Sequence, residues 1–338
     1  MTRRFDPRDL LRVRRLQPAG CSLDMEGDVL IGSSPLRLAL RGLLPVGPAK
    51  VSTLVQGDGD PVSGGLVQAR WRRGGRSADL IFIAPDLNGA AGAAHVWHRL
   101  VTGACQSLGD RQAERIYAAV DDEDRVALQV FRQLGFVAFT NDAVYRRSPG
   151  APAPRPNRGP VGDAGTVHQA QITSLFLATL PSTVRAHVDP EGDTWTRYPA
   201  GGWLRTAVPA RVLVGDDGSV AAAWRLFSGP GGWWLQVLGS GDEDVAAAVT
   251  HALHDMAAAA APESPLFCQA PGYDTALNLA LRGAHFEPVR RRFLLVKHTT
   301  ARVLEPEWRS RAAEAGLDVA PSHTAVGSHT SGLRTDER

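Results

Sequence analysis

The apolar and polar positions between Glu114 and Arg147 change their period twice, which predicts three successive elements. The segment ERIYAAV, 114–120, mixes β-branched, aromatic and small residues as a buried strand does. Apolar residues then recur at helical spacing, at Val126, Val130, Phe131 and Leu134. Asp124 precedes this helix as an N-cap, and Gly135 follows it as a C-cap glycine. The residues that follow predict a closing hairpin.

The residues before this segment predict antiparallel strands and one crossover helix. Prolines bound a short amphipathic helix from Pro35 to Pro45. Strands are expected at 50–56, 65–73 and 78–85, with a turn-rich connection between the first two. After Pro85 the chain passes through a glycine- and alanine-rich turn into a helix with apolar residues at Val96, Leu100 and Val101. Together these elements predict an α/β (α+β) fold with a mixed sheet.

The pattern of the first half returns in the second half. Val67, Ala69, Trp71 and Arg72 recur in the same order as Val220, Ala222, Trp224 and Arg225. Asp124, Phe131 and Phe136 recur as Asp274, Leu281 and Phe286. Two groups of matches at nearly constant separation predict two copies of one fold.

Proline, glycine and polar residues divide the chain into four parts. Residues 1–147 form the expected N-terminal domain, and 148–165 are rich in Pro and Gly and predict a semi-rigid linker. Residues 166–303 form the expected C-terminal domain. Residues 304–338 are polar and predict a mobile tail.

Composition excludes several classes of function without selecting one. The chain has 338 residues, enough for two domains, and 43% of them are hydrophobic. Its 37 basic and 35 acidic residues give a net charge of +2, which favours neither nucleic acid nor an anionic membrane. Its three cysteines are widely spaced and predict neither a disulfide framework nor a metal cluster. Without an apolar signal segment, the sequence predicts a soluble cytoplasmic protein.

The helix after the ERIYAAV strand resembles the C-terminal signature of the GNAT acetyltransferases. In that family an Asn leads the helix, an Ala follows three residues later, and a Tyr lies four residues before a Gly-Phe pair. The corresponding residues here are Asp124, Ala127, Phe131 and the pair Gly135-Phe136. The resemblance implies two tandem GNAT-like folds and acetyl-CoA as cosubstrate. It also implies that Asp124 and Phe131 lie beside the cofactor.

The same resemblance places the cofactor's pyrophosphate at the turn after Pro85. The family motif is Gln or Arg, two residues, Gly, one residue, then Gly or Ala. The corresponding residues are Asn88, Gly89, Ala90, Ala91, Gly92 and Ala93, and a shift of one residue puts Gly92 and Ala94 on the small positions. Backbone N–H groups at a helix start bind phosphate, and small residues let it approach. The preceding strand, with Ile83, would carry the pantetheine arm. A tight strand-to-helix turn without a ligand explains the loop equally well.

The second copy has acidic residues at the matching turn. Asp242, Glu243 and Asp244 lie where the pyrophosphate would bind. Each carboxylate would repel a phosphate by on the order of 1 kcal/mol. The C-terminal domain is therefore predicted to be a degenerate copy without CoA binding.

Candidate catalytic residues are few, and none is assigned. The family's acid is a Tyr, but the matching positions hold Phe131 and Leu281. Possible bases are Asp79, Gln68 and the acids at 121–124, although an N-cap cluster explains the last group. The histidine pairs His95/His98 and His251/His254 lack a third metal ligand at an expected spacing, so no metal is predicted. The basic run 290–292 predicts a solvated edge strand protected by charge.

Two functions remain open from the sequence. The first is an N-acetyltransferase that moves an acyl group from acetyl-CoA to an amine of a small molecule or peptide. The second is a catalytically inactive tandem protein that serves as a ligand-binding or assembly scaffold. Neither interpretation calls for nucleic acid or a membrane, and both are compatible with a homodimer.

Overall fold

The computed structural model describes residues 2–32, 34–43, 51–58, 60–72, 74–87, 92–152, 154, 161–188, 205–259 and 263–299. The predicted tail, 304–338, lies outside these residues, as do residues 153 and 155–160 of the predicted linker. Residues 1–301 form one compact unit by their internal contacts. Both predicted copies therefore belong to that unit.

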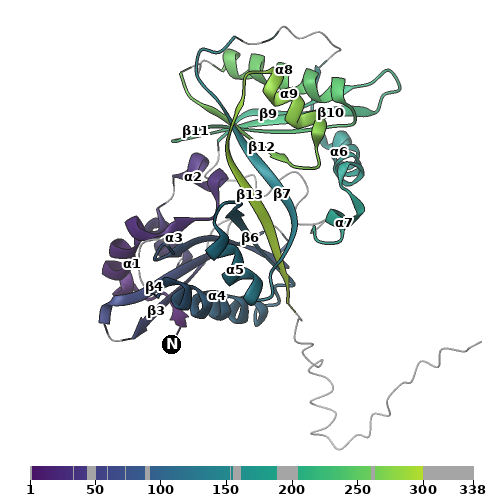
Figure 1. Cartoon of the computed structure of the whole chain (residues 1–338). Coiled ribbons are helices and arrows are strands. Elements are labelled where there is room, and N and C mark those ends of the chain that lie inside the picture. The colour runs from purple at the N-terminus through teal and green to yellow at the C-terminus, as the bar shows by residue number, and fades with distance from the viewer. Residues whose placement is uncertain are drawn as a thin grey trace, which may run out of the picture. The chain divides into compact units, whose positions relative to one another are not determined.

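The first half contains the predicted elements and a few that the sequence pattern did not predict (Figure 1). Its strands are β1 (Thr2–Arg4), β2 (Cys21–Ser22), β3 (Val51–Asp58), β4 (Asp60–Trp71), β5 (Ser77–Ala84), β6 (Arg115–Asp121) and β7 (Val137–Arg147). Its helices are η1 (Pro7–Asp9), α1 (Leu10–Leu16), η2 (Gln17–Ala19), α2 (Met25–Ile31), α3 (Pro35–Gly42), α4 (Ala93–Gly109) and α5 (Arg125–Gln133). The connection expected between β3 and β4 is itself mostly strand.

The second half repeats this order. Its strands are β8 (Val161–Asp163), β9 (Arg205–Val214), β10 (Val220–Gly229), β11 (Gly232–Gly239), β12 (Leu266–Pro271) and β13 (Glu287–His298). Its helices are α6 (Thr166–Thr179), α7 (Ser182–Arg185), α8 (Asp242–Ala258) and α9 (Thr275–Gly283). Asp124 accepts a hydrogen bond from Ala127 N at 2.9 Å, and Asp274 accepts one from Leu277 N at 2.9 Å. The repeated aspartates are thus N-caps of equivalent helices.

The strands of both halves form one 13-stranded sheet, in the order β1-β3-β4-β5-β6-β13-β7-β12-β11-β10-β9-β8, with β2 on β5. The last strand of each half pairs with strands of the other half. β13 pairs with β6, β7 pairs with β12, and β13 and β7 pair antiparallel with each other. Figure 1 shows β7 and β13 side by side between the other strands of the two halves. Each half is therefore completed by a strand of the other.

This exchange corrects two expectations for individual strands. β7 is a single long strand and forms no hairpin with a following strand of its own half. β13 lies between β6 and β7, so the edge position predicted for residues 290–292 is wrong. Its arginines are held by ion pairs: Arg290 Nε lies 2.5 Å from Asp121 Oδ1, and Arg292 Nη2 lies 2.7 Å from Asp142 Oδ2.

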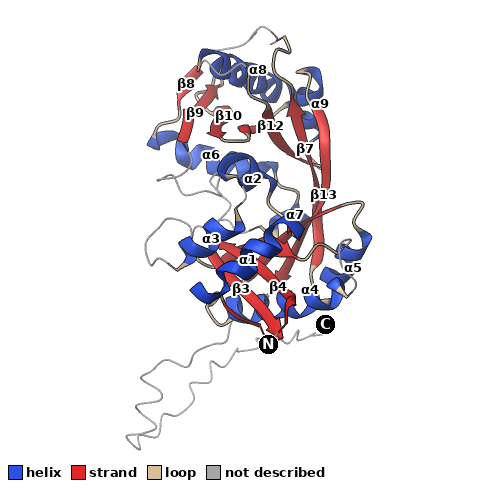
Figure 2. Cartoon of the chain, turned by 90° about the vertical axis from the view of Figure 1, so that its left-hand side faces the viewer, coloured by secondary structure: helices blue, strands red, loops and turns tan. Residues whose placement is uncertain are grey.

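Helices cover both faces of the sheet in the first half. On one face α4 and α5 bury Trp97, Leu100 and Phe131 against β4, β5 and β6. On the other face α1 and α3 pack on Val55 and Leu66, and Figure 2 shows these two helices in front of β3 and β4.

The second half is covered on one face by α8 and α9, which pack around Trp224 and Leu235. Its other face receives α6 and also α2 of the first half, whose Leu30 packs with Phe227 and Trp234. The two halves therefore share helices as well as strands.

Candidate functional site

The parallel strands β5 and β6 pair only at their beginnings. Their partners are Ser77 with Arg115, Ala78 with Ile116 and Asp79 with Tyr117. β5 continues to Ala84 and β6 to Asp121 without further pairs between them. The strands therefore diverge after Asp79, which leaves a cleft in the sheet of the kind that the GNAT resemblance implies for a pantetheine arm.

A segment of the chain itself lies along β5 in this cleft. β2 pairs antiparallel with β5, Cys21 with Ile83 and Ser22 with Phe82. Leu23 N donates to Ile81 O at 3.0 Å, and Asp86 N donates to Ala19 O at 2.6 Å. Residues 19–23 thus supply hydrogen bonds along the part of β5 that does not pair with β6.

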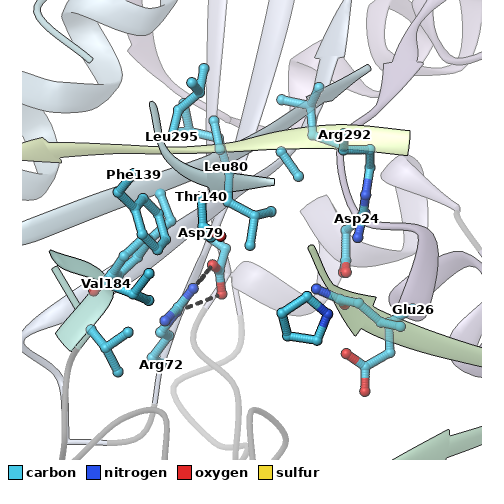
Figure 3. Close-up of a pocket in the computed structure, with 18 of the residues that line it drawn as sticks. Asp24, Glu26, Arg72, Asp79, Leu80, Phe139, Thr140, Val184, Arg292 and Leu295 are labelled. Atoms are coloured by element: carbon cyan, nitrogen blue, oxygen red, sulfur yellow. Dashed lines mark hydrogen bonds and ion pairs between the residues drawn. The ribbon is translucent and has the colours of Figure 1, made fainter. Parts of the chain in front are cut away.

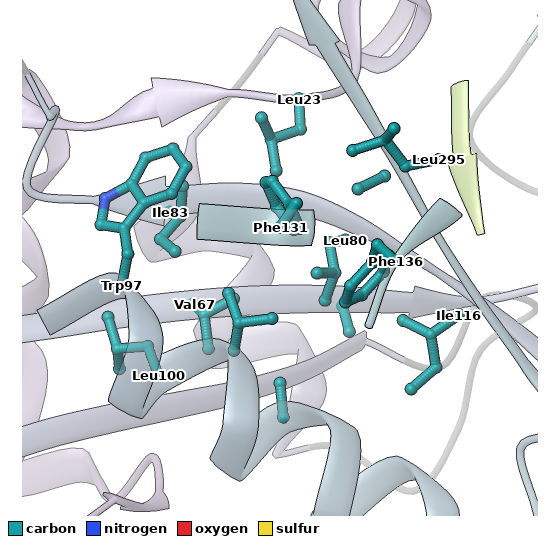
Figure 4. Packing of buried hydrophobic residues seen from close by; sticks show 14 of the residues in the cluster. Leu23, Val67, Leu80, Ile83, Trp97, Leu100, Ile116, Phe131, Phe136 and Leu295 are labelled. Atoms are coloured by element: carbon teal, nitrogen blue, oxygen red, sulfur yellow. The ribbon is translucent and has the colours of Figure 1, made fainter. Parts of the chain in front are cut away.

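The segment packs tightly against β5. A Cβ on Gly20 would lie 2.1 Å from Phe82 Cζ and 2.9 Å from the Ala84 Cβ. Leu23 is 7% exposed and belongs to the same hydrophobic cluster as Leu80 and Phe131, and Figure 4 shows these side chains close together. Burial raises the pKa of the Cys21 thiol to about 11, which makes it a poor nucleophile at neutral pH.

The predicted phosphate loop is described only at its end. Asn88, Gly89, Ala90 and Ala91 lie outside the described residues. Gly92 precedes α4 with a φ of 81°, and a Cβ there would meet nothing within 4 Å. Ala93 begins α4 and is buried, and no acidic residue lies in the first turn. This helix start leaves space for an anion, and the binding roles of these residues stay predictions.

Asp124 and Phe131 have structural contacts of their own. Asp124 caps α5, as described above. Phe131 is 0% exposed, with its ring centroid 6.0 Å from that of Trp97 and 5.0 Å from that of Phe136, both edge-on. Phe131 is thus a core residue, and contact with a cofactor stays a prediction for both.

Acyl-CoA does not fit the first cleft with residues 19–23 in place. A pantetheine arm that runs along β5 needs the backbone groups of Ile81 and Ile83 on the side facing β6. Ile81 O already accepts a hydrogen bond from Leu23 N, and Ile83 is paired with Cys21. The cleft is therefore filled at the position where the arm would bind.

In the second half, β11 and β12 diverge in the same way, and the helix that follows β11 begins with acidic residues. β11 and β12 pair only from Trp233–Leu266 to Leu235–Cys268. A cavity of about 170 Å³ lies beyond the last pair, along residues 234–238 of β11. Asp242, Glu243 and Asp244 occupy the first turn of α8. Burial raises the pKa of the Asp274 carboxyl, and the negative charge of Asp242 contributes to the rise. A phosphate would meet this negative field.

A second cavity, which we call the central cavity, has a volume of about 180 Å³ and begins where β5 and β6 diverge. Both halves contribute to it: β4, β5, β6 and residues 23–26 from the first, and α6, α7, β12 and β13 from the second. One part of its wall is apolar, formed by Leu80, Phe139, Phe176, Leu180, Val184, Val188, Leu294 and Leu295. Figure 3 shows Phe139, Val184 and Leu295 apart from Asp24, Glu26 and Arg292 across this space.

The other part of the wall carries charges of both signs in a chain. Arg70 Nη1 lies 2.5 Å from Asp24 Oδ2, and Arg70 Nη2 lies 3.9 Å from Asp79 Oδ2. Arg72 binds Asp79 through Nε at 3.0 Å and Nη2 at 2.6 Å (Figure 3). The Arg72 guanidinium lies 3.7 Å from the centroid of the Tyr117 ring. The carboxylates and guanidiniums alternate, so this wall offers carboxylates to a positive group and guanidiniums to a negative group of a ligand.

Glu26 extends the polar wall toward the second half. Gln236 Nε2 donates to Glu26 Oε1 at 3.1 Å, and Arg225 donates to Gln236 Oε1 at 2.7 and 2.9 Å. Burial lowers the pKa of the Arg225 guanidinium to about 9, and the charge of Glu26 partly opposes this shift.

Four of the candidate bases from the sequence, Gln68, Asp79, Asp121 and Asp124, are engaged in structural contacts. Asp79 is held by Arg72, and Asp121 accepts two hydrogen bonds from Arg290. Gln68 donates to Pro35 O at 2.8 Å and to Thr53 Oγ1 at 3.0 Å. The structure brings Asp79 to the central cavity and leaves Gln68 away from it.

The histidine pairs have separate surroundings. His251 stacks on Trp224 with ring centroids 5.6 Å apart, and His254 Nε2 lies 3.0 Å from Pro154 O. In the described part of the chain, no three His, Cys, Asp or Glu side chains gather as a metal site requires. Among the described helices, none is long and apolar enough to cross a membrane.

Sequence reasoning missed most of the central cavity. Glu26, Arg70 and Tyr273 come from segments far apart in the chain, and no spacing connects them. One signal was present: Arg70 on β4 and Arg72 directly after it alternate with apolar residues, which put two charges on one side of a segment expected to be a strand. Burying charges requires partners, and these partners form the cavity wall.

Comparison with known proteins identifies the architecture. No protein-family model matches the chain, and no curated protein matches its sequence. A GCN5-related N-acetyltransferase from Sphaerobacter thermophilus aligns over 88% of this chain and 95% of its own, with a TM-score of 0.54 and 13% identity. A tandem GNAT protein from the clavulanic acid biosynthesis pathway aligns over 88% and 98%, with a TM-score of 0.55 and 12% identity. Likeness at such identity concerns the fold, and this chain has a tandem GNAT fold.

Proposed function

We propose that the protein binds a small amphiphilic zwitterion in the central cavity, a molecule about the size of an amino acid with an apolar side chain. The observation that carries the proposal is that the cavity wall combines apolar side chains with side chains of both signs of charge. A cavity of ~150 Å³ accommodates a benzene ring, so about 180 Å³ accommodates an apolar side chain of similar size.

The charged wall can receive a zwitterion without leaving a charge unpaired. The ammonium group of the ligand would approach Asp24 and Asp79, and its carboxylate would approach Arg70. The contact of 3.9 Å between Arg70 Nη2 and Asp79 Oδ2 is the longest of the three ion pairs described above, and we expect the ligand to insert there. Burial of the apolar part would contribute roughly 1.5–3 kcal/mol.

Calorimetry on the full-length protein tests this proposal with three probes. L-Phenylalanine carries both charges, phenethylamine lacks the carboxylate, and 3-phenylpropionate lacks the amine. We expect the zwitterion to bind at least tenfold more tightly than either analogue. Equal affinity for the three probes, or no binding of any of them, would contradict the proposal.

A matched pair of variants locates the binding. Ala119 lines the central cavity, whereas Ala138 is exposed on β7 and does not line it. Ala119→Leu should weaken L-phenylalanine binding at least tenfold because its side chain occupies the cavity. Ala138→Leu should leave the affinity unchanged, and the melting temperature of each variant checks that it is folded.

The second candidate function is N-acetyl transfer from acetyl-CoA to an amine of a small molecule or peptide. Two observations favour it: the start of α4 has no acidic residue and has open space at Gly92, and one chain of similar fold is named an N-acetyltransferase. Acetyl-CoA would bind with its pyrophosphate at Gly92 and Ala93, and its pantetheine arm would have to displace residues 19–23 from β5. Steady release of CoA with one member of an amine panel would establish this function in place of simple ligand binding.

Gly92 offers a direct test of phosphate binding at α4. If acetyl-CoA binds there, Gly92→Glu should abolish binding, because its carboxylate would face the phosphates. Gly92→Ala is the control, since it carries the same backbone strain at a φ of 81° without the charge. Calorimetry with acetyl-CoA measures both variants, and an equal effect of the two would exclude a phosphate site at this helix.

A further inference from the structure

We infer that residues 19–23 are a built-in substitute for the pantetheine arm of acyl-CoA, so that the first cleft is closed to the cofactor by the protein's own chain. The segment is called the insert strand below. This inference does not rest on the proposed ligand of the central cavity.

Without the insert strand, the divergence of β5 and β6 would leave backbone groups of β5 without hydrogen-bond partners. Ile81 and Ile83 are 4% and 0% exposed, so their N–H and C=O groups cannot all turn to water. A buried backbone group without a partner costs free energy comparable to a lost hydrogen bond. Pantetheine supplies such partners through its amides. Here the insert strand supplies them: Leu23 N donates to Ile81 O, Cys21 pairs with Ile83, and Ala19 O accepts from Asp86 N. One acceptor such as Ile81 O cannot serve both in the same geometry.

Both ends of the insert strand are anchored by neighbouring elements. At its beginning, α1 buries Val13 completely against the first half. At its end, Asp24 is paired with Arg70 at 2.5 Å. Next along the chain, α2 buries Leu30 against the second half, and Gly231 N donates to Val29 O at 2.9 Å. Leaving the cleft would therefore disturb contacts in both halves, unlike the opening of a surface loop.

The insert strand also contributes to the wall of the central cavity. Leu23 and Asp24, at the end that lies nearest the divergence of β5 and β6, both line the central cavity. The segment thus closes the cleft on the cofactor side and forms part of the wall of the cavity on the other side. Leu23 therefore belongs both to the filled cleft and to the wall of the central cavity.

Hydrogen exchange on the full-length protein tests the inference without relying on activity. We expect the amides of Leu23 and Ile83 to exchange at least a hundredfold more slowly than those of an unstructured chain. Addition of 1 mM acetyl-CoA should leave these rates unchanged. Fast exchange of Leu23 without ligand, or acceleration over residues 19–23 on addition of acetyl-CoA, would overturn the inference.

A glycine substitution provides the matched variant. Gly20 has extended backbone, with φ −106° and ψ 167°, so a side chain is excluded there only by Phe82 and Ala84. Gly20→Val should push the insert strand from β5 and accelerate exchange over residues 21–23 at least tenfold, while β6 stays protected. Gly109→Val is the control, because a Cβ at Gly109 meets nothing within 4 Å. An unchanged exchange rate in Gly20→Val would show that the strand does not lie against Phe82.

Discussion

Phe131 shows how one residue can fit a family pattern and yet have a different environment. It occupies the position of the family's tyrosine, but its ring is fully buried between Trp97 and Phe136. A hydroxyl added at this ring would lie in an apolar cluster. Phe131 therefore contributes to the packing of the hydrophobic core.

Phe131→Tyr should accordingly destabilise the protein without creating catalysis. An unsatisfied buried hydroxyl costs about 1–3 kcal/mol. Urea unfolding of the variant measures this loss, and an assay of CoA release measures activity. A variant as stable as the parent, or one with new thioester consumption, would show that the ring faces a polar cleft.

Asp274 links the acidic start of α8 to the capping of α9. Its pKa is raised mainly by burial and further by the charge of Asp242. Because the folded-state pKa lies above the unfolded value, deprotonation of Asp274 lowers stability as the pH rises from the unfolded value through the folded one.

Asp242→Asn should lower the pKa of Asp274 toward its ordinary value of 3.8, because one of the charges that raise it is removed. Carboxyl carbon chemical shifts, followed by NMR over a pH titration, measure this change. Glu243→Gln is the control, since Glu243 is not among the causes of the shift. An unchanged Asp274 titration in Asp242→Asn would contradict the proximity of the two carboxylates.

At the scale of elements, the two copies share a capped helix that starts after a diverging strand. Asp124 and Asp274 each accept one backbone hydrogen bond at 2.9 Å from the third residue on. The helices then bury Phe131 and Leu281 at equivalent positions.

Asp124→Ala and Asp274→Ala should each destabilise the protein by about 1 kcal/mol, the usual value of an N-cap. Asparagine at either position keeps an acceptor oxygen and should restore most of the loss. Denaturant unfolding compares the four variants. Alanine variants without any loss would mean that the carboxylates are not the caps.

The sequence predicted these elements well because their signals are local. Helical periodicity, the capping aspartates and the turn glycines act within a few residues, so α3, α4 and α5 could be placed. β2 was missed because a two-residue strand has no period of its own and forms only when β5 offers an unpaired edge. α2 was missed for a similar reason, because its apolar residues pack on the other half.

At the scale of the whole molecule, the exchange of β7 and β13 is the dominant feature. Arg292 on β13 and Asp142 on β7 form an ion pair with side chains 5% and 0% exposed, and Gln269 also donates to Asp142. Removing one partner of such a buried pair costs roughly 3–5 kcal/mol. The centre of the sheet is therefore made of contacts between the halves.

A fragment of residues 1–155 should not fold as an independent monomer, because β6 would lose β13, and β7 would lose both of its neighbours. We expect no cooperative thermal transition by circular dichroism. Mixing it with a fragment of residues 156–303 should restore the transition. A cooperative melt of the isolated monomeric fragment would contradict the exchange and support two independent domains.

The sequence by itself determined the repeated order of elements, the capping residues and the acidic turn of the second copy. Each depends on residues close together in the chain, where periodicity and side-chain chemistry act directly. Tertiary structure decided the strand exchange, the insert strand in the first cleft and the charged wall of the central cavity. These depend on which backbone edges remain unpaired and which buried charges meet, and both are settled only when distant segments pack.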